Sequence, residues 1–401
     1  MNPDLDKLHP YPFEKLASLK SGINPNPQLE HIALSIGEPK HKAPEFVLEH
    51  LQQHLNGVSA YPLTKGIPEL RQAITNWLVQ RFNLPAESIN HEQNVIPVNG
   101  TREALFAFAQ AVIDREKNPV IVMPNPFYQI YEGAAYLSGA EPFYINTTAE
   151  NNYLPDFDSV SDETWTRCQL LYICSPGNPT GAVIDKTTLQ KLITLAEKHD
   201  FIIASDECYS ELYFDEAHPP VGLLEAAAEM GNTDYSRCVV FHSLSKRSNL
   251  PGLRSGFVAG EKNILDTFLK YRTYHGCAMP LHHQQASIKA WQDEAHVKEN
   301  RKIYQKKFTD VLEILAPVLD VKKPDAGFYL WADLSLKTHF TDENFAKELF
   351  AQQNMTVLPG SYLSREAHGI NPGYQHVRMA LVASYEECIE AAQRIRQFIK
   401  N

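Results

Sequence analysis

One stretch of the chain, Ser243–Gly256, gathers side chains that could hold both an aldehyde and a phosphate. Lys246 follows Ser243 and Ser245, and Arg254 comes eight residues after the lysine. A lysine amine forms a Schiff base when its position is fixed and when it is helped to lose its proton. Hydroxyl groups and an arginine fork are donors that a phosphate monoester needs. The alternative is a polar surface loop with an exposed lysine, and other segments must decide between the two.

Two further segments place polar side chains after apolar runs. Asp206 ends an apolar run of strand length, Tyr209 follows three residues later, and Asn178 lies in the stiff loop of residues 175–181. These groups suit pyridoxal 5′-phosphate (PLP), because a carboxylate keeps its pyridine nitrogen protonated and the ring then accepts electrons. An amide and a phenol can both donate to the phenolic oxygen of the same ring.

A third segment offers a phosphate-binding turn. Gly100 and Thr101 follow the apolar run of residues 95–98 and precede a helical pattern. The N–H groups exposed at the start of a helix bind phosphate, and the helix dipole favours its negative charge. Gly100, Asn178, Asp206 and the residues from Ser243 to Lys246 all come just after apolar runs. Ligands on parallel sheets lie at the carboxyl ends of the strands. The residues therefore predict one PLP site.

In this order, the motifs resemble those of the fold-type I PLP enzymes, the class I and II aminotransferases, over about residues 36–378. The resemblance implies that Lys246 binds the cofactor aldehyde and moves the proton, and that Asp206 pairs with the pyridine nitrogen. It implies Asn178 and Tyr209 at the phenolic oxygen. The implied phosphate-binding group consists of Gly100, Thr101, Ser243, Ser245 and Arg254.

Substrate contacts are implied at both ends of the chain. Gly37, in the segment of residues 35–39, matches the family position where the backbone passes over the substrate. Arg378 matches the arginine for the substrate α-carboxylate, which a planar guanidinium meets with two hydrogen bonds. Asn178 is implied beside it.

Two aromatic positions complete the implied site. Tyr128 matches the residue that stacks on the cofactor ring, and its neighbour Phe127 is the alternative. Tyr61 matches a tyrosine that reaches the cofactor phosphate of the partner subunit. This resemblance implies a homodimer with shared active sites.

Composition argues against other classes of protein. The formal net charge of −11 disfavours a nucleic-acid surface. No apolar run approaches the ~18 residues of a membrane span, and no signal core follows the first residues, so we expect a cytoplasmic protein that binds no membrane. The six cysteines form no Cys-x-x-Cys pair, and the histidines form no His-x-x-x-His motif with a third ligand. We expect neither a disulfide framework nor a bound metal.

Apolar runs alternate with helical patterns from about residue 45 to residue 275. This alternation predicts an α/β fold with a mostly parallel sheet flanked by helices, the PLP-dependent transferase fold type I that the resemblance implies. We expect an N-terminal arm over residues 1–44, a large PLP-binding domain over 45–280 and a smaller α/β C-terminal domain over 281–401. The arm is expected to pack on the small domain. One long helical stretch is expected over residues 281–315.

A finer resemblance concerns the substrate. Residues 1–16, 34–41 and 124–133 resemble those of bacterial succinyldiaminopimelate aminotransferases. The resemblance implies a ping-pong transfer from L-glutamate to N-succinyl-2-amino-6-oxopimelate, in lysine and diaminopimelate biosynthesis. Such an acceptor carries several carboxylates, and Lys40 and Arg272 are weak candidates for binding those that Arg378 does not reach.

Other functions remain possible on the same residues. One is a PLP C–S lyase or a cyclopropane-forming enzyme, which would use the same lysine, aspartate and tyrosine. Another is a broader aspartate, aromatic or acetylornithine-type aminotransferase. A PLP-sensing regulator would resemble a helix-turn-helix domain fused ahead of this fold, and Gly37 lies too near the start of the chain for one.

Overall fold

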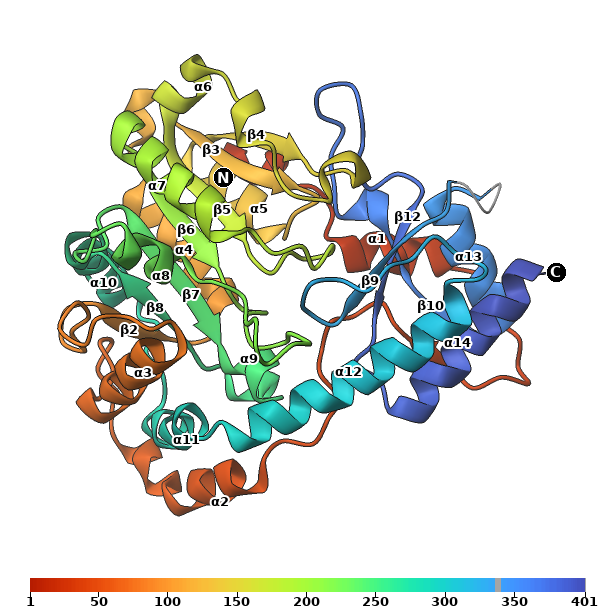
Figure 1. The fold of residues 1–401 in the computed structure, drawn as a ribbon, viewed down its shortest axis with the longest axis horizontal. Helices are drawn as coiled ribbons and strands as arrows, with labels where there is room; N and C mark the ends of the chain where they lie inside the picture. Colours follow the sequence, from red (N-terminus) through yellow and green to blue (C-terminus); the bar gives the residue numbers. More distant parts are fainter. Residues whose placement is uncertain (336–339, 401) are drawn as a thin grey trace.

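A seven-stranded sheet forms the centre of the larger part of the molecule (Figure 1). The computed structural model describes residues 1–335 and 340–400. In spatial order the strands are β2 (Val95–Val98), β8 (Gly256–Gly260), β7 (Cys238–Ser243), β6 (Ile202–Asp206), β5 (Cys168–Cys174), β3 (Val120–Asn125) and β4 (Glu141–Asn146). Strand β8 runs antiparallel to both of its neighbours, and the remaining pairs are parallel. The expected α/β fold with a mostly parallel sheet is confirmed.

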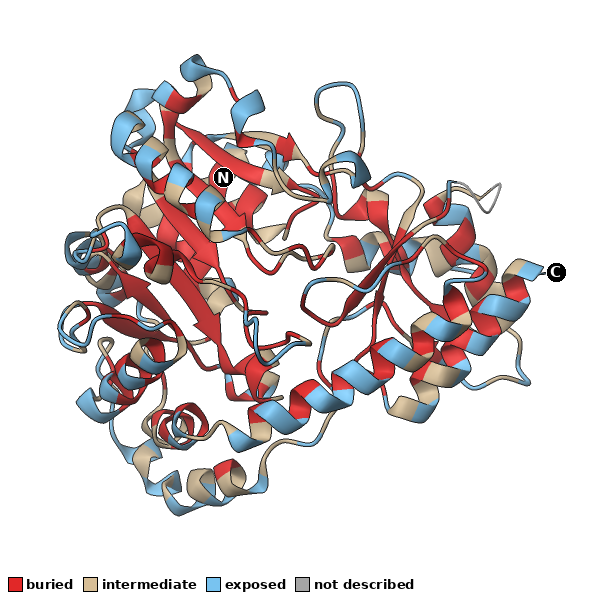
Figure 2. Cartoon of the chain, in the orientation of Figure 1, coloured by how far each residue is buried: buried red, intermediate tan, exposed pale blue. Residues whose placement is uncertain are grey.

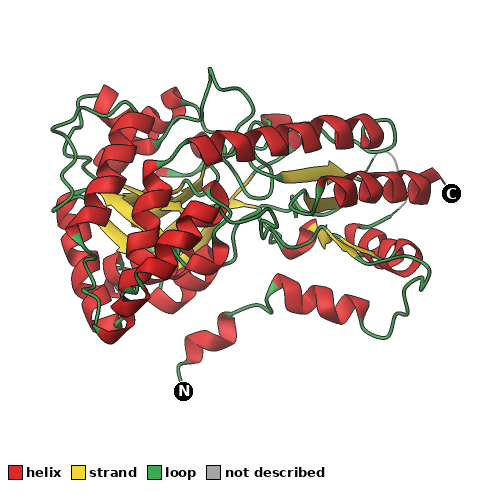
Figure 3. Ribbon diagram, turned by 90° about the horizontal axis from the view of Figure 1, so that it is seen from below, coloured by secondary structure: helices red, strands yellow, loops and turns green. Residues whose placement is uncertain are grey.

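Strand β5 shows why the sheet is covered on both faces. Successive side chains of a strand point to opposite faces. Leu170 and Tyr172 accordingly pack in one hydrophobic cluster, and Leu171 and Ile173 pack in the other. Helices lie on both sides of the strands (Figure 3), and the strands are buried except for the edge strand β4, which is mostly half-buried (Figure 2).

The two clusters contain different helices. One cluster takes side chains from α4 (Thr101–Val112), α5 (Ile130–Ser138) and α10 (Lys262–His275). The other takes side chains from α2 (Glu45–Gln53), α3 (Pro68–Arg81), α6 (Asp162–Arg167), α7 (Lys186–His199), α8 (Leu223–Glu229) and α11 (Leu281–Gln292). The sheet is therefore the middle layer of three.

A smaller part has its own sheet and core. Its three strands, in the order β11 (Leu358–Pro359), β12 (His376–Ala380) and β9 (Tyr329–Asp333), are antiparallel. A separate hydrophobic cluster joins this sheet to α12 (Ala295–Leu315), α13 (Asp342–Gln353) and α14 (Tyr385–Lys400).

The N-terminal arm contacts this smaller part. After the short helical turn η1 (Pro3–Lys7) comes α1 (Pro12–Lys20), which packs against α13. Strand β1 (Ile32–Ala33) then pairs in parallel with β10 (Met355–Thr356). The division into arm, large domain and small domain stays a prediction. Helix α11 packs against α2 and α3 and belongs to a core cluster of the large sheet, although it begins at residue 281.

Two local predictions differ from the structure. The apolar runs on either side of residues 243–256 predict a strand, a loop and a strand, but β7 continues into the one-turn helix α9 (Leu244–Arg247) and then into a 3-10 turn, Pro251–Leu253. We expected one helix over residues 281–315, but Asp293 and Glu294 separate α11 from α12. Helix α12 then extends from the larger part of the molecule to the smaller part (Figure 1). None of the helices within the described ranges is both long and apolar enough to cross a membrane.

Candidate functional site

The predicted site residues meet at one edge of the large sheet. Strands β2, β5, β6 and β7 are all parallel to one another, so that their carboxyl ends lie together. Asp206 is the last residue of β6 and is paired with Cys174, the last residue of β5. Ser243 ends β7 opposite Gly256, where β8 begins. Because β8 runs the other way, Arg254 reaches the same edge just before its strand starts.

A cavity of about 640 Å³ opens at this edge. Its lining includes Gly37, Thr101, Tyr128, Asn178, Asp206, Tyr209, Ser243, Ser245, Lys246, Arg254 and Arg378. Gly100 lies directly behind Arg254. Tyr61 is fully exposed and does not belong to this lining, so its contact with a partner subunit stays a prediction.

Lys246 stands on the single turn of α9. Its Nζ donates a hydrogen bond to the carbonyl oxygen of Gly37 and lies 5.3 Å from the ring centre of Phe328. Burial lowers the pKa of this amine to about 8, and the positive charge of Arg378 acts in the same direction. Near neutral pH, the fraction of the amine that is neutral and nucleophilic is therefore larger for Lys246 than for an exposed lysine.

Asp206 is a buried carboxylate with partners on both oxygens. The hydroxyl of Tyr131 donates to its Oδ2 at 2.7 Å, and the backbone N–H of Cys208 donates to its Oδ1 at 3.3 Å. Burial raises the pKa of Asp206, and these hydrogen bonds oppose the increase because they stabilise the charged form. Such a carboxylate can accept a hydrogen bond from a protonated ring nitrogen in the cavity.

Hydroxyls, a guanidinium and a helix start lie on one side of the cavity. Ser243 donates to Ser245 between their Oγ atoms at 2.9 Å. Gly100, with φ of 84°, caps helix α4, of which Thr101 is the first residue. A Cβ atom at Gly100 would lie 2.1 Å from Nη2 of Arg254, so only glycine lets this guanidinium approach the helix start. The group has the donors and the positive charge that a phosphate requires.

Arg378 projects into the cavity from the small sheet. Its Nη1 donates to Oδ1 of Asn178 at 2.9 Å, and its Nη2 donates to the carbonyl oxygen of Ser35 at 2.8 Å. Its Nε is buried without a hydrogen-bond partner. No carboxylate within residues 1–335 and 340–400 forms an ion pair with Arg378, so its charge is available to a carboxylate ligand.

Three aromatic residues shape the cavity wall. The hydroxyl of Tyr209 lies 3.1 Å from that of Tyr329. A Cβ atom at Gly37 would lie 1.9 Å from the Tyr329 hydroxyl, which explains why the backbone there can pass so close. Tyr128 lines the cavity, whereas Phe127 is buried in the core and stacks on Tyr144. Of the two candidates for the ring-facing aromatic, the geometry favours Tyr128.

Sequence reasoning missed two polar side chains at this site. Arg102 lines the cavity and donates from Nε to the hydroxyl of Tyr128 at 2.7 Å. Tyr131 binds Asp206. The signals were present, because Arg102 follows Thr101 in the first turn of a helix, and Tyr131 follows Tyr128 by three residues.

A further part of the lining was not predicted from its residues alone. Tyr11, Pro12 and Phe13 of the arm also line the cavity, and only the resemblance over residues 1–16 linked this segment to the substrate.

One candidate contact was wrong. Arg272 is completely buried, and its Nη1 donates to both carboxylate oxygens of Glu103 at 2.9 and 2.8 Å. Arg272 therefore forms a structural ion pair with Glu103 and does not reach the cavity. Lys40 is exposed and lies outside the cavity lining.

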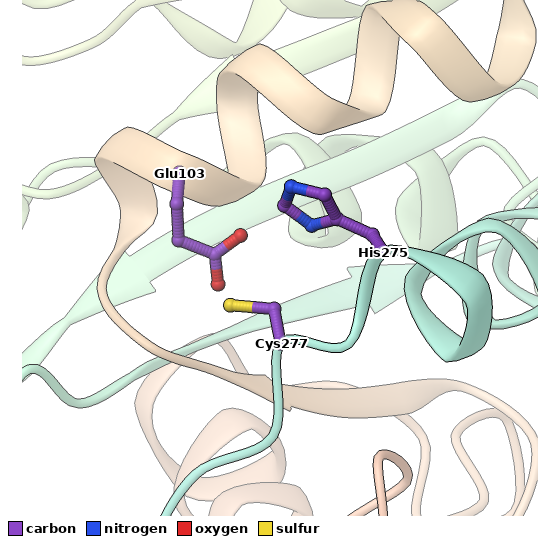
Figure 4. A group of neighbouring side chains, drawn as sticks. All are labelled: Glu103, His275 and Cys277. Carbon is purple, nitrogen blue, oxygen red and sulfur yellow. The ribbon is translucent and has the colours of Figure 1, made fainter.

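Glu103 also belongs to a group with His275 and Cys277 whose possible ligand atoms lie within 4.8 Å of one another (Figure 4). Its carboxylate already accepts from Arg272 and from the N–H of Asn99. A cation bound there would face the guanidinium at close range, which disfavours a metal.

Comparison with known proteins identifies the family. Residues 30–395 match the family model of the class I and II aminotransferases. The chain belongs to this family. An LL-diaminopimelate aminotransferase of Maridesulfovibrio salexigens is 30% identical to this aminotransferase over 98% of this chain and 97% of its own.

Solved structures agree with this assignment. An aminotransferase from Neisseria meningitidis is 47% identical, with a TM-score of 0.94 over 99% of this chain and all of its own. The aminotransferase AspB from Helicobacter pylori is 35% identical, with a TM-score of 0.89 over 98% of this chain and 99% of its own.

Members of this family use PLP, and the residues of this aminotransferase fit that cofactor. The hydroxyls, Arg254 and the helix start beside Gly100 suit the phosphate. Asp206 suits the pyridine nitrogen, and the amine of Lys246 suits the aldehyde. When bound, PLP supplies an electron-accepting ring beside the substrate α-carbon.

Proposed function

We propose that this aminotransferase transfers the amino group of L-glutamate to N-succinyl-2-amino-6-oxopimelate. The products are N-succinyl-LL-2,6-diaminopimelate and 2-oxoglutarate, and the step belongs to lysine and diaminopimelate biosynthesis. Support for the diaminopimelate skeleton comes from relatives named LL-diaminopimelate aminotransferase, which are 28–30% identical. The succinyl group is our inference from the resemblance of residues 1–16, 34–41 and 124–133, and the charge of the cavity supports it.

The charge of the cavity carries this proposal. Arg102, Lys246, Arg254 and Arg378 line it, against the carboxylates of Asp206 and Glu38. Lys246 and Arg254 are assigned to the cofactor, which leaves two guanidiniums for substrate carboxylates. In residues 1–335 and 340–400, no carboxylate forms an ion pair with Arg102. N-succinyl-diaminopimelate has three carboxylates and one free amine, whereas LL-diaminopimelate has two carboxylates and a second ammonium that this lining would repel.

Each proposed catalytic side chain has one task. Arg378 binds the substrate α-carboxylate through its two terminal nitrogens, with Asn178 fixing its plane. The neutral amine of Lys246 would take the proton from the substrate α-carbon and return it to the carbon that carries the cofactor's aldehyde. Asp206 keeps the ring nitrogen protonated, and Tyr209 donates to the phenolic oxygen.

The active enzyme is proposed to be a homodimer. Tyr61 is fully exposed, and Leu55, Val58 and Leu63 of the same segment are also exposed. Apolar side chains that cluster in this way mark an interaction surface. A second copy that covers this segment would carry Tyr61 to the phosphate of its partner.

We also propose a cytoplasmic location. All six cysteines are free thiols in the structure, which suits a reducing compartment.

A glutamate-coupled assay tests the substrate. The purified enzyme is run in reverse with 2-oxoglutarate and one amino donor at a time, and glutamate is measured. The donors are N-succinyl-LL-2,6-diaminopimelate, LL-diaminopimelate, aspartate, phenylalanine and N-acetylornithine. The largest kcat/KM is expected for the succinylated compound, and Lys246→Ala should abolish turnover of every donor.

Other outcomes have definite meanings. A preference for LL-diaminopimelate would keep the skeleton and remove the succinyl group from the proposal. A preference for aspartate or phenylalanine would assign a broader aminotransferase. Product formation without any oxo acid would assign a lyase instead.

A further inference from the structure

Tyr131 occupies a fixed position beneath the cofactor site. It is completely buried on α5, and its hydroxyl lies 2.7 Å from Oδ2 of Asp206. Its ring stacks on Tyr172, with centroids 4.7 Å apart and planes within 12°. It also meets Tyr128 edge-on at 5.8 Å. These contacts leave the hydroxyl little freedom to leave the carboxylate.

The direction of this hydrogen bond follows from the two groups. Burial and the charge of Asp206 raise the pKa of Tyr131 well above its usual range, so its hydroxyl stays protonated and donates. Burial alone would favour the neutral acid form of Asp206, and donation from Tyr131 favours the carboxylate. A neutral acid at this position could not keep a ring nitrogen positively charged.

We propose that Tyr131 is a positioning residue that holds Asp206 ionised and aimed at the ring nitrogen of PLP. The inference rests on the proposed role of Asp206. Tyr131 itself touches neither ring nor substrate in this scheme and acts only through the carboxylate. Because Tyr128 lies two residues before α5 begins and Tyr131 is in its first turn, one short segment would fix both the aromatic at the ring face and the donor to the acid.

The variant Tyr131→Phe removes the hydroxyl and keeps the ring. Two quantities are measured on this variant besides turnover: the dissociation constant of PLP from the apoenzyme, and the pH midpoint of the absorbance change of bound PLP. The dissociation constant of PLP should rise by about tenfold, because the variant loses one hydrogen bond to a charged group. The pH midpoint should rise by about half a unit, because a ring nitrogen with less positive charge withdraws fewer electrons. Turnover should fall by about tenfold as well.

Tyr172→Phe is the matched control. Tyr172 is as buried as Tyr131, and the two rings stack on each other. The hydroxyl of Tyr172, however, donates to the carbonyl oxygen of Leu105 at 2.6 Å. Both variants should lower Tm, since each loses one buried hydrogen bond. Only Tyr131→Phe should move the pH midpoint.

A second substitution keeps the test decisive if Tyr131→Phe does not fold. Replacing Tyr131 with 3-fluorotyrosine makes the hydroxyl a stronger donor and should move the midpoint in the opposite direction. An unchanged midpoint in the folded Tyr131 variants, or equal shifts in the Tyr131 and Tyr172 variants, would overturn the inference. If the wild-type apoenzyme does not bind PLP, or if Asp206→Ala leaves its binding and turnover intact, the proposed function itself fails.

Discussion

Lys307, near the middle of α12, donates from Nζ to Nε2 of His41 at 2.7 Å. The remaining hydrogens of this ammonium go to the carbonyl oxygens of Leu381, at 3.1 Å, and of Ala383. Since Nε2 of His41 accepts, its Nδ1 carries the proton and donates to Oδ1 of Asn300 at 2.9 Å. Only neutral His41 fits between these partners.

This pair predicts a loss of stability in acid. Burial and the charge of Lys307 lower the pKa of His41 below its ordinary 6.5. The unfolded chain therefore binds this proton at a higher pH than the folded chain, so stability is complete above about pH 6.5 and is lost as the pH falls through the folded pKa. Each unit of difference between the two pKa values is worth about 1.4 kcal/mol.

The measurement is Tm between pH 7.5 and pH 5. His41→Gln should flatten this dependence relative to the wild type, and the same change at the exposed His368 should leave it as it is. A variant that keeps the full wild-type slope would show that other histidines cause it.

The low pKa of Lys246 predicts how fast the apoenzyme captures PLP. The neutral amine is the reacting form, and burial lowers its pKa to about 8. The capture rate, followed by absorbance after mixing, should rise with pH and level off above about pH 8. Lys246→Arg should show no such reaction. A rate that keeps rising toward pH 10 would mean that the pKa of this amine is not depressed.

Gly100→Ala should weaken PLP binding more than it weakens the fold. The new Cβ would displace the guanidinium of Arg254, and alanine at φ 84° and ψ 152°, a region that glycine alone adopts readily, adds about 1–3 kcal/mol of strain. Gly231→Ala is the matched control, because Gly231 has the same φ of 84° and a Cβ atom there would have no neighbour within 4 Å. Tm should fall in both variants, and further in Gly100→Ala because of the contact with Arg254, whereas the dissociation constant of PLP should rise only in Gly100→Ala.

Arg102→Leu should reduce selectivity for acceptors and donors with several carboxylates. Loss of a charged hydrogen-bonding partner is worth about 1.5–3 kcal/mol, so KM for N-succinyl-LL-2,6-diaminopimelate should rise by about tenfold or more. KM for phenylalanine should change little. Lys40→Ala, which removes an exposed cation outside the cavity, should leave both values as they are. Equal effects on both substrates would place Arg102 in cofactor binding instead.

Local patterns predicted the fold well where strands were buried and apolar, as at residues 170–174 and 201–206. They failed where a helix was too short to show periodicity, as at Leu244–Arg247. They also failed at Asp293 and Glu294, where the helical pattern continues across a break that only packing reveals.

The site was predictable to a similar degree. Residues such as Asp206 and Ser243 end strands, so topology brings them together once the sheet is known. Arg272 could not be judged from sequence, because its partner Glu103 lies far away in the chain. Tyr131 looked like any core aromatic, since its function depends on where one oxygen atom points.

The lining of the cavity extends from Tyr11 to Arg378, nearly the full length of the chain. During synthesis, the sheet edge with its lysine leaves the ribosome well before the last strand of the small sheet. A growing chain could therefore hold the cofactor's phosphate before it can bind a substrate carboxylate. A translation product that stops short of Arg378 would have the lysine without the arginine proposed to bind the substrate α-carboxylate.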